Sequence, residues 1–235
     1  MPAKSRSTDN SRSGAPVRGV GAGSHEPATE KSRRTRASLV DAARRVFDRD
    51  GFLDARITDI SREAGLAHGS FYTHFASKEA IFTEVALQVE QEIYDATRAP
   101  EYGRGTDLIA DIEAANRGYI EAYRKNRQMM LLITQVALFN EEVRRVQQQA
   151  WGTFITRLEH AIARMQGAGI ADPALDPHYA AQALGAMVDR FMNVWMLFEA
   201  NYDLDKAVET LTVFWTRALG LPGTGLPTEG TPATD

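Results

Sequence analysis

The chain has 235 residues, 43% of them hydrophobic, and a formal net charge of −4 at pH 7. This length and composition allow one large or two modest hydrophobic cores. Cysteine is absent, which excludes a disulfide framework, a thiol nucleophile and a thiolate metal site. No apolar run is long enough to span a bilayer, and the N-terminus lacks the apolar core of a signal sequence. We therefore expect a cytoplasmic protein without a membrane partner.

The charge is unevenly distributed along the chain. Residues 1–78 hold 14 basic and 9 acidic residues, a net charge of +5, whereas residues 79–235 hold 13 and 22, a net charge of −9. We call the basic N-terminal part the head and the acidic remainder the body. With this distribution, only the head attracts phosphate groups. Residues 1–30 are rich in Ser, Gly, Ala, Arg and Pro, a composition that predicts a disordered basic tail.

A first helix is predicted over residues 35–50. Its face at helical spacing consists of Leu39, Ala43, Val46 and Phe47, and Gly51 is expected to end it. Basic residues run directly into this helix, and we expect them to contact phosphates or the minor groove of DNA. These residues are Lys31, Arg33, Arg34 and Arg36.

Two short helices are predicted next, over residues 58–64 and 68–74, with Gly65 supplying the freedom for a tight turn. Phe71 and Phe75 lie four residues apart and can pack inward together. The remaining residues of the second helix then form a small polar face of a kind that suits the DNA major groove. They are His68, Gly69, Ser70, Tyr72, Thr73 and His74.

Gly69 lies inside this second helix, where glycine lowers helix stability by ~1 kcal/mol relative to alanine. Its presence is understandable if the backbone must come close to a phosphate or a base. Ser77 is placed to cap the following helix, with Lys78 at its start, positioned for a phosphate.

The sequence A-G-L-A-H-G-S-F-Y-T-H-F-A-S-K-E-A-I, residues 64–81, closely resembles the DNA-binding signature of the tetracycline-repressor (TetR-like) family. The resemblance covers residues 33–82 well, and beyond them only chain length and helical pattern agree. Members usually carry a capping Ser where this chain has Ala67, and Thr or Ser where it has Ala55 and Arg56. The matching residues are Ala64, Gly65, Gly69, Phe71, Tyr72, Phe75, Ser77, Lys78 and Glu79.

The resemblance implies a double-stranded DNA operator as partner. Arg56 can replace a hydroxyl–phosphate contact by a charged one, or reach a base. Together with the polar face, the residues expected to contact DNA are Arg33, Arg34, Arg36, Arg56, Thr58, His68, Gly69, Ser70, Tyr72, Thr73, His74 and Lys78.

The remainder of the chain shows helical periodicity and no strand pattern. A helix over residues 77–98 leaves the head and enters the body, where we expect the functional hinge, and a Pro- and Gly-containing break follows at 99–106. Five further helices are predicted over residues 107–125, 127–138, 141–165, 176–200 and 203–219.

The predicted fold is therefore all-α, with an N-terminal three-helix helix-turn-helix domain at 31–80 and a larger C-terminal helical domain at 81–220. The latter would bind an effector and dimerise. Residues 221–235 are expected to form a second disordered tail.

The last two predicted helices are apolar on more than one face, so each needs partners on two sides. One interpretation is a thick monomer core; the other is a symmetric homodimer formed by these helices, which the family resemblance also implies. The residues assigned to the dimer interface are Leu184, Val188, Phe191, Leu211, Phe214 and Trp215.

Methionine, aromatic and isolated polar residues recur in the body. Each residue alone is explained by a well-filled core, but together they suit an apolar ligand pocket with a few polar groups. The family resemblance implies a body that binds a small molecule and releases DNA, and the hydrophobic inventory favours a lipophilic effector. The candidate pocket residues are Asn116, Tyr119, Tyr123, Met130, Gln135, Trp151, Phe154, Asp189, Met192, Asn193 and Trp195.

An enzyme is the main rival from another class. The chain has no Gly-rich phosphate loop, no H-E-x-x-H, no G-x-S-x-G and no His, Asp and Glu cluster with metal spacing. We therefore expect no catalytic residue, metal or cofactor. A helical protein–protein interaction module is a second rival, although the polar face of residues 68–78 lacks apolar anchors for a protein partner. A DNA-binding activator also remains open, while the resemblance favours a repressor.

Overall fold

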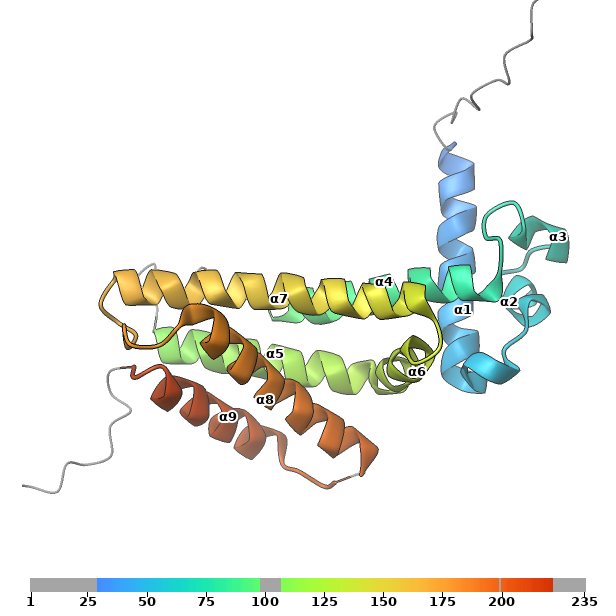
Figure 1. Cartoon of the computed structure of the whole chain (residues 1–235). Coiled ribbons are helices and arrows are strands. Elements are labelled where there is room, and N and C mark those ends of the chain that lie inside the picture. The colour runs from blue at the N-terminus through green and yellow to red at the C-terminus, as the bar shows by residue number, and fades with distance from the viewer. Residues whose placement is uncertain (1–28, 98–106, 199, 222–235) are drawn as a thin grey trace, which may run out of the picture.

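The computed structural model describes residues 29–97, 107–198 and 200–221, and it contains helices without any strand in these ranges (Figure 1). The all-α prediction is confirmed. None of the described helices is long and apolar enough to cross a membrane. In chain order the helices are α1 (Glu30–Asp54), α2 (Ile57–Glu63), α3 (His68–Phe71), α4 (Lys78–Ala96), α5 (Leu108–Lys125), α6 (Arg127–Ala137), α7 (Glu141–Gly167), α8 (Pro177–Leu197) and α9 (Leu204–Ala218).

Helix α1 begins earlier than the periodicity predicts. The hydroxyl of Thr29 accepts a hydrogen bond from the Ser32 amide, and Glu30 pairs with Arg33 and Arg34 in the first turn. Capping and charge pairing thus extend the helix over residues that carry no apolar stripe. Gly51 breaks the helix as predicted, with φ +75 and ψ 177. The tail at 1–28, the break at 98–106 and the tail at 222–235 lie outside the described residues.

Helices α1 to α3 and the start of α4 form the head around an aromatic core. Phe47 and Phe82 meet edge to face with ring centroids 5.0 Å apart, and Phe52 and Phe82 do so at 4.9 Å. Phe71 and Phe75 are buried, as predicted, with centroids 5.8 Å apart. The first three rings hold α1 against α4, while α2 packs on α1 and α3 packs on α2, which stabilises two helices that are too short to be stable alone.

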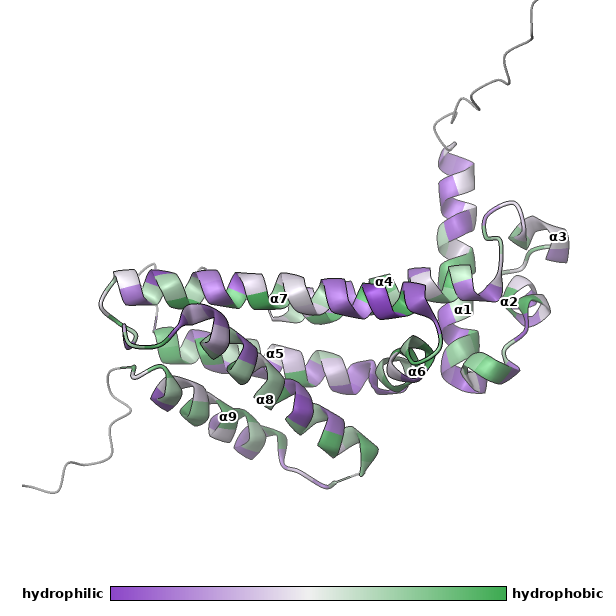
Figure 2. Cartoon of the chain, in the orientation of Figure 1, coloured by the Kyte–Doolittle hydropathy of each residue, from purple (hydrophilic) through white to green (hydrophobic). Residues whose placement is uncertain are grey.

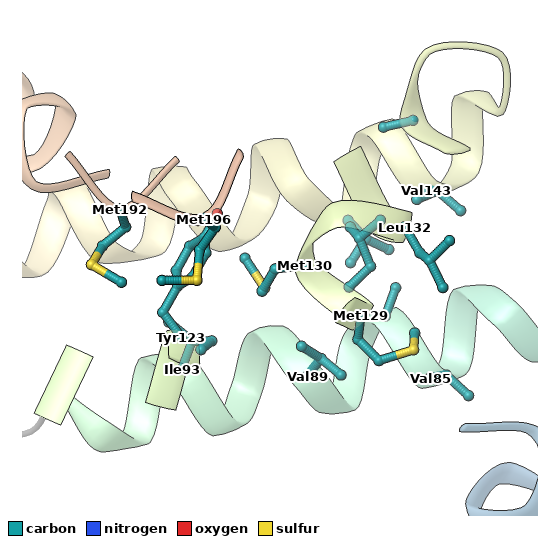
Figure 3. Packing of buried hydrophobic residues seen from close by; sticks show 14 of the residues in the cluster. Val85, Val89, Ile93, Tyr123, Met129, Met130, Leu132, Val143, Met192 and Met196 are labelled. Carbon is teal, nitrogen blue, oxygen red and sulfur yellow. The ribbon is translucent and has the colours of Figure 1, made fainter. Parts of the chain in front are cut away.

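Helix α4 belongs to both parts of the molecule. Its N-terminal turns pack on α1, and its later turns pack on α5, α6 and α7. Figure 3 shows Val85, Val89 and Ile93 along one side of α4, facing methionines of α6. At Gly118 of α5 an added Cβ would lie 2.0 Å from the carbonyl oxygen of Ala96, so only glycine permits this approach of α5 to α4.

The body is built from α5 to α9 around the second half of α4. Helix α7 runs alongside α4, α8 packs on α7 and crosses the body obliquely, and α9 packs on α5 (Figure 1). Side-chain oxygens of Asp107, Asn140, Asp176 and Asp203 cap α5, α7, α8 and α9, which explains why these helices begin where the sequence predicted. Figure 2 shows the outer end of α8 as hydrophobic.

Candidate nucleic-acid interface and ligand cavity

The turn between α2 and α3 has the predicted geometry. Gly65 adopts φ +68, and the Leu66 amide donates to the Ser61 carbonyl at 2.9 Å. Helix α3 ends at Phe71, and residues 72–74 form turns. The backbone amides of His74 and Phe75 both donate hydrogen bonds to the Phe71 carbonyl. The predicted helix over 68–74 is therefore only one helical turn followed by a looser turn.

The polar face of α3 is exposed at the outer end of the molecule (Figure 1). His68, Gly69 and Thr73 are exposed, and Tyr72 is 54% exposed. The imidazole of His68 meets the Tyr72 ring edge to face at 5.4 Å, which orients both side chains. No atom lies within 4 Å of a Cβ built at Gly69. Packing within the chain does not require glycine there, so a close approach from outside remains the better explanation.

Neither short helix has a side-chain cap. Arg56 precedes α2 and Ala67 precedes α3, and neither side chain bonds to the first turn. Arg56 and Thr58 are exposed beside the start of α2. The first amides of both helices thus have no capping side-chain oxygen, and uncapped amides at a helix start can bind phosphate oxygens.

Lys78 differs from its expected role. Its ammonium donates to the carbonyls of Phe52, Leu53 and Ala55 at 2.7, 3.1 and 3.0 Å, and it lies 4.7 Å from the Phe52 ring centroid. An ammonium has only three donors. Lys78 therefore ties the end of α1 to the start of α4, and its main contacts are structural.

Arg36 is also engaged within the head. Its guanidinium forms a bidentate ion pair with Glu84, in which both hydrogen bonds are 2.7 Å long. The guanidinium also lies 4.7 Å from the Phe75 ring centroid. The Arg36 guanidinium lowers the pKa of the Glu84 carboxyl through these hydrogen bonds. Arg33 and Arg34 keep exposed side chains that share Glu30, and so are freer to reach a phosphate.

The body contains a cavity of about 320 Å³ between α4, α5, α7 and α8. Eight predicted pocket residues line it: Asn116, Tyr119, Tyr123, Met130, Trp151, Phe154, Asp189 and Asn193. Met192 and Trp195 are buried but do not line the cavity, because they point into the packing around α8. Gln135 is exposed on α6. These three residues therefore lie outside this cavity, and their assignment to an effector site stays a prediction.

The polar side of the cavity lies between α5 and α8. The Tyr119 hydroxyl donates to Asp189 Oδ1 at 3.2 Å, and the Asn193 amide donates to Asp189 Oδ2 at 3.1 Å. Burial raises the pKa of Asp189, whereas these hydrogen bonds oppose the rise. Burial also raises the pKa of Tyr123 and, strongly, that of Tyr119, so both phenols stay neutral.

Several lining residues were not predicted, most notably Glu90 of α4. Burial, and repulsion from Asp189, raise the pKa of Glu90 to about 7. A charged residue on the apolar stripe of α4 was the signal that could have indicated it. Arg157 of α7 also lines the cavity; it donates to the Thr97 hydroxyl and to the Tyr94 carbonyl, the latter at 3.4 Å.

Most residues assigned to the dimer interface are internal in the single chain. Leu184, Val188, Leu211 and Trp215 are all at most 7% exposed, and Val188 and Trp215 line the cavity. These side chains face the body's own core, so their assignment to a dimer interface stays an untested prediction that the single chain does not favour. Phe191 is half-buried, and Phe214 is 51% exposed. The outward apolar residues of this region are Tyr179, Leu197, Phe198 and Phe214.

Helix α4 connects the cavity to the head. Glu90, Ile93 and Tyr94 line the cavity, and Glu84 pairs with Arg36 of α1 two turns earlier. A shift of α4 that accommodates a ligand would therefore change the position of the head relative to the body.

Comparison with known proteins supports both parts of this arrangement. Residues 39–85 match the bacterial regulatory proteins of the tetR family, and residues 112–219 match the C-terminal domain of the transcriptional regulator EthR. The HTH-type transcriptional regulator TtgR of Pseudomonas putida is 26% identical over 189 residues, which cover 77% of this chain and 89% of TtgR. The A-factor receptor protein of Streptomyces griseus is 30% identical over 168 residues, covering 72% of this chain and 56% of that protein.

The fold has solved counterparts. The crystal structure of NalD, the secondary repressor of the MexAB-OprM multidrug efflux pump in Pseudomonas aeruginosa, superposes with a TM-score of 0.63 at 24% identity, covering 82% of this chain and 100% of NalD. The matched families and relatives are transcriptional regulators and not enzymes, in agreement with the sequence prediction. An N-terminal helix-turn-helix head joined by one long helix to a helical body completes the correspondence: the chain belongs to the TetR family of DNA-binding transcriptional regulators.

Proposed function

We propose that the protein is a ligand-responsive repressor that binds a near-palindromic operator as a homodimer and is released by a small, largely lipophilic effector. The observation that carries this proposal is the cavity of about 320 Å³ lined by α4, the same helix that seats the head. Its volume falls within the range of small-molecule sites, roughly 300–1,000 Å³. The names of NalD, a repressor, and of the A-factor receptor agree with such a role.

The DNA contacts divide into two kinds. His68, Ser70 and Thr73 are assigned to base edges, because they lie on the turn that would enter the major groove. Tyr72, the uncapped first turns of α2 and α3, and the outward arginines are assigned to phosphates. The arginines are Arg33, Arg34 and Arg56.

A homodimer is proposed because one helical turn reads few base pairs. Two heads on a rigid dimer would read half-sites about one helical turn, ~34 Å, or a multiple of it apart. The exposed apolar side chains of Tyr179, Leu197, Phe198 and Phe214 at α8 and α9 are suited to this contact.

The release mechanism that we propose is a displacement of α4 on ligand binding. A ligand that prefers a body with α4 displaced would favour a separation of the two heads that no longer fits the operator. The ligand must bind the displaced state more tightly than the DNA-competent one, because equal affinity shifts no population.

The test is binding-site selection from random duplex DNA with the full chain, followed by gel shifts of the selected duplex at two salt concentrations. A near-palindromic consensus and a steep loss of affinity with salt are expected. Substitution of Ser70 or Thr73 should change the selected consensus. A protein that binds no duplex, or a consensus without symmetry that stays unchanged in these variants, would contradict the proposal.

A further inference from the structure

Two carboxylates line the effector cavity, and neither forms an ion pair within the described parts of the chain. Glu90 lies on α4 and Asp189 on α8, and each contributes to the cavity wall. Asp189 accepts hydrogen bonds from the neutral side chains of Tyr119 and Asn193 only. Glu90 has neither a hydrogen bond nor an ion pair within the described parts of the chain. A carboxylate that is removed from water without a partner is unfavourable, so this pair calls for a proton or a cation.

The cationic side chains nearby do not neutralise this pair. Arg157 is the one cation among the described lining residues, and its guanidinium donates to Thr97 and Tyr94 at the C-terminal end of α4. It also lies 4.2 Å from the Tyr94 ring centroid. Arg190, next to Asp189, is on the exposed side of α8. The charge of Arg190 lowers the pKa of Asp189, but neither carboxylate forms an ion pair with a described side chain.

Aromatic rings surround the same space. Tyr119 and Tyr123 lie with ring centroids 5.7 Å apart on the α5 side, and Trp151 and Phe154 lie 6.1 Å apart on the α7 side. Aromatic faces attract organic cations, most strongly where water is excluded. Gly185 of α8 keeps this wall close, since an added Cβ would lie 3.1 Å from Phe154 and 3.2 Å from Trp151.

The arrangement does not suit a metal ion. No group of three or more His, Cys, Asp or Glu residues that could hold a metal occurs in the described ranges. The cavity of about 320 Å³ is also far larger than an ion requires. An anionic ligand would meet two carboxylates, against which only the already engaged Arg157 could act.

We propose that the effector is a lipophilic organic cation, with its positive group held between Glu90 and Asp189 and its apolar body against the aromatic wall. This inference rests on the proposed ligand-responsive function and specifies the chemistry of its effector. Binding would replace the mutual repulsion of the two carboxylates by attraction to a shared cation. Because Glu90 belongs to α4, this attraction would act on the helix that seats the head.

Isothermal titration calorimetry of the full-length protein with three probes that share a naphthylmethyl body and differ in charge tests the inference. The probes are the cation (1-naphthylmethyl)trimethylammonium, the neutral alcohol 1-naphthylmethanol and the carboxylate anion 1-naphthaleneacetate. We expect the ammonium to bind about tenfold or more tightly than the alcohol, and the acetate to bind most weakly. Glu90→Gln and Asp189→Asn should each weaken ammonium binding by about tenfold and leave the alcohol unchanged.

Glu121→Gln is the matched control, because it removes an exposed carboxylate of α5 that does not line the cavity. It should leave the affinity for the ammonium as in the parent protein. Alcohol or acetate that binds the parent protein as tightly as the ammonium would overturn the cation inference while leaving a ligand-responsive repressor intact. Failure of all three probes to bind would count against both, and a ligand-free parent protein that binds no operator in the gel shift would count against the proposed function alone.

Discussion

Arg44 of α1 and Glu92 of α4 are joined by two hydrogen bonds, 2.5 and 3.2 Å long, at the point where the head meets the body. Arg44 also donates to the Asn126 side chain between α5 and α6, and the Asn126 amide donates back to Glu92 at 3.3 Å. The hydrogen bonds with Arg44 lower the pKa of Glu92. The Arg44 guanidinium thus connects α1, α4 and the body. Its partner Glu92 lies two residues along α4 from Glu90, which lines the cavity.

A double-mutant cycle with Arg44→Met and Glu92→Gln measures this connection. Because both side chains are partly exposed, we expect a coupling free energy of about 1 kcal/mol in urea unfolding rather than the larger value of a buried pair. The exposed pair Arg117 and Asp205 is the control and should show no measurable coupling. Strictly additive effects of the two substitutions would show that the contact does not couple the head to the body.

Lys78→Met should lower stability as well as DNA affinity. The substitution keeps the aliphatic stem but removes three hydrogen bonds to carbonyls, so we expect the free energy of unfolding to fall by about 2 kcal/mol. Tyr72→Phe is the matched comparison, because it removes only an exposed hydroxyl: DNA affinity should fall equally for all sequences without loss of stability. Urea unfolding and gel shifts measure both effects. If Lys78→Met leaves the free energy of unfolding unchanged, the three carbonyl contacts do not stabilise the fold, and Lys78 acts through phosphate alone.

Ala67→Ser should supply the missing cap of α3. A serine oxygen at this position can accept from the first-turn amides, and we expect a gain of about 0.5–1 kcal/mol in the free energy of unfolding. Ala76→Ser is the control, since Ala76 is exposed and precedes the existing cap Ser77. Thermal unfolding of both variants decides the matter, and an equal effect of the two serines would rule out capping as the cause.

Glu90→Gln should stabilise the protein in a pH-dependent way. Folding raises the pKa of Glu90 from 4.5 to about 7, so the folded state binds its proton more tightly than the unfolded chain. Stability is therefore lost as pH rises from about 4.5 to about 7, by a total of about 3 kcal/mol at most. The glutamine variant lacks this loss.

Urea unfolding of the parent and the Glu90→Gln variant at about pH 5 and about pH 8 tests this expectation. The variant should exceed the parent in stability mainly at the higher pH. Glu121→Gln, on the exposed side of α5, should show no such pH-dependent gain. A difference between Glu90→Gln and the parent that is the same at both pH values would mean that Glu90 does not titrate as its surroundings indicate.

Phe214→Arg should dissociate the proposed homodimer. Phe214 is 51% exposed, so the single chain can accept arginine there, but an apolar interface between two copies cannot. Sedimentation equilibrium should report a monomer with unchanged helix content. Leu87→Arg, at a 45% exposed position on α4, should leave the dimer intact. Trp215→Arg would instead unfold the body, because Trp215 is 7% exposed. A dimeric Phe214→Arg variant would refute this interface.

The sequence by itself determined the helices and the head. Apolar periodicity, Gly65, the inward phenylalanines and the capping residues act over a few neighbouring positions, and local rules describe them well. The α1 to α3 arrangement and most body helix boundaries therefore appear in the structure nearly where they were predicted. The start of α1 was missed, because Thr29 and Glu30 extend it by contacts that leave no apolar pattern.

Tertiary structure decided which face of each helix lines the cavity, which packs in the core and which is exposed. An apolar helix such as α8 presents several candidate faces, and only its packing against α7 and α5 turned Val188 and Asp189 to the cavity and left Phe198 72% exposed. Lys78 and Arg36 are similar: their partners Phe52 and Glu84 are distant in sequence, so the chain pattern could not reveal that their charges are already engaged. Periodicity specifies a helix, but the orientation of its faces depends on neighbours brought together only by folding.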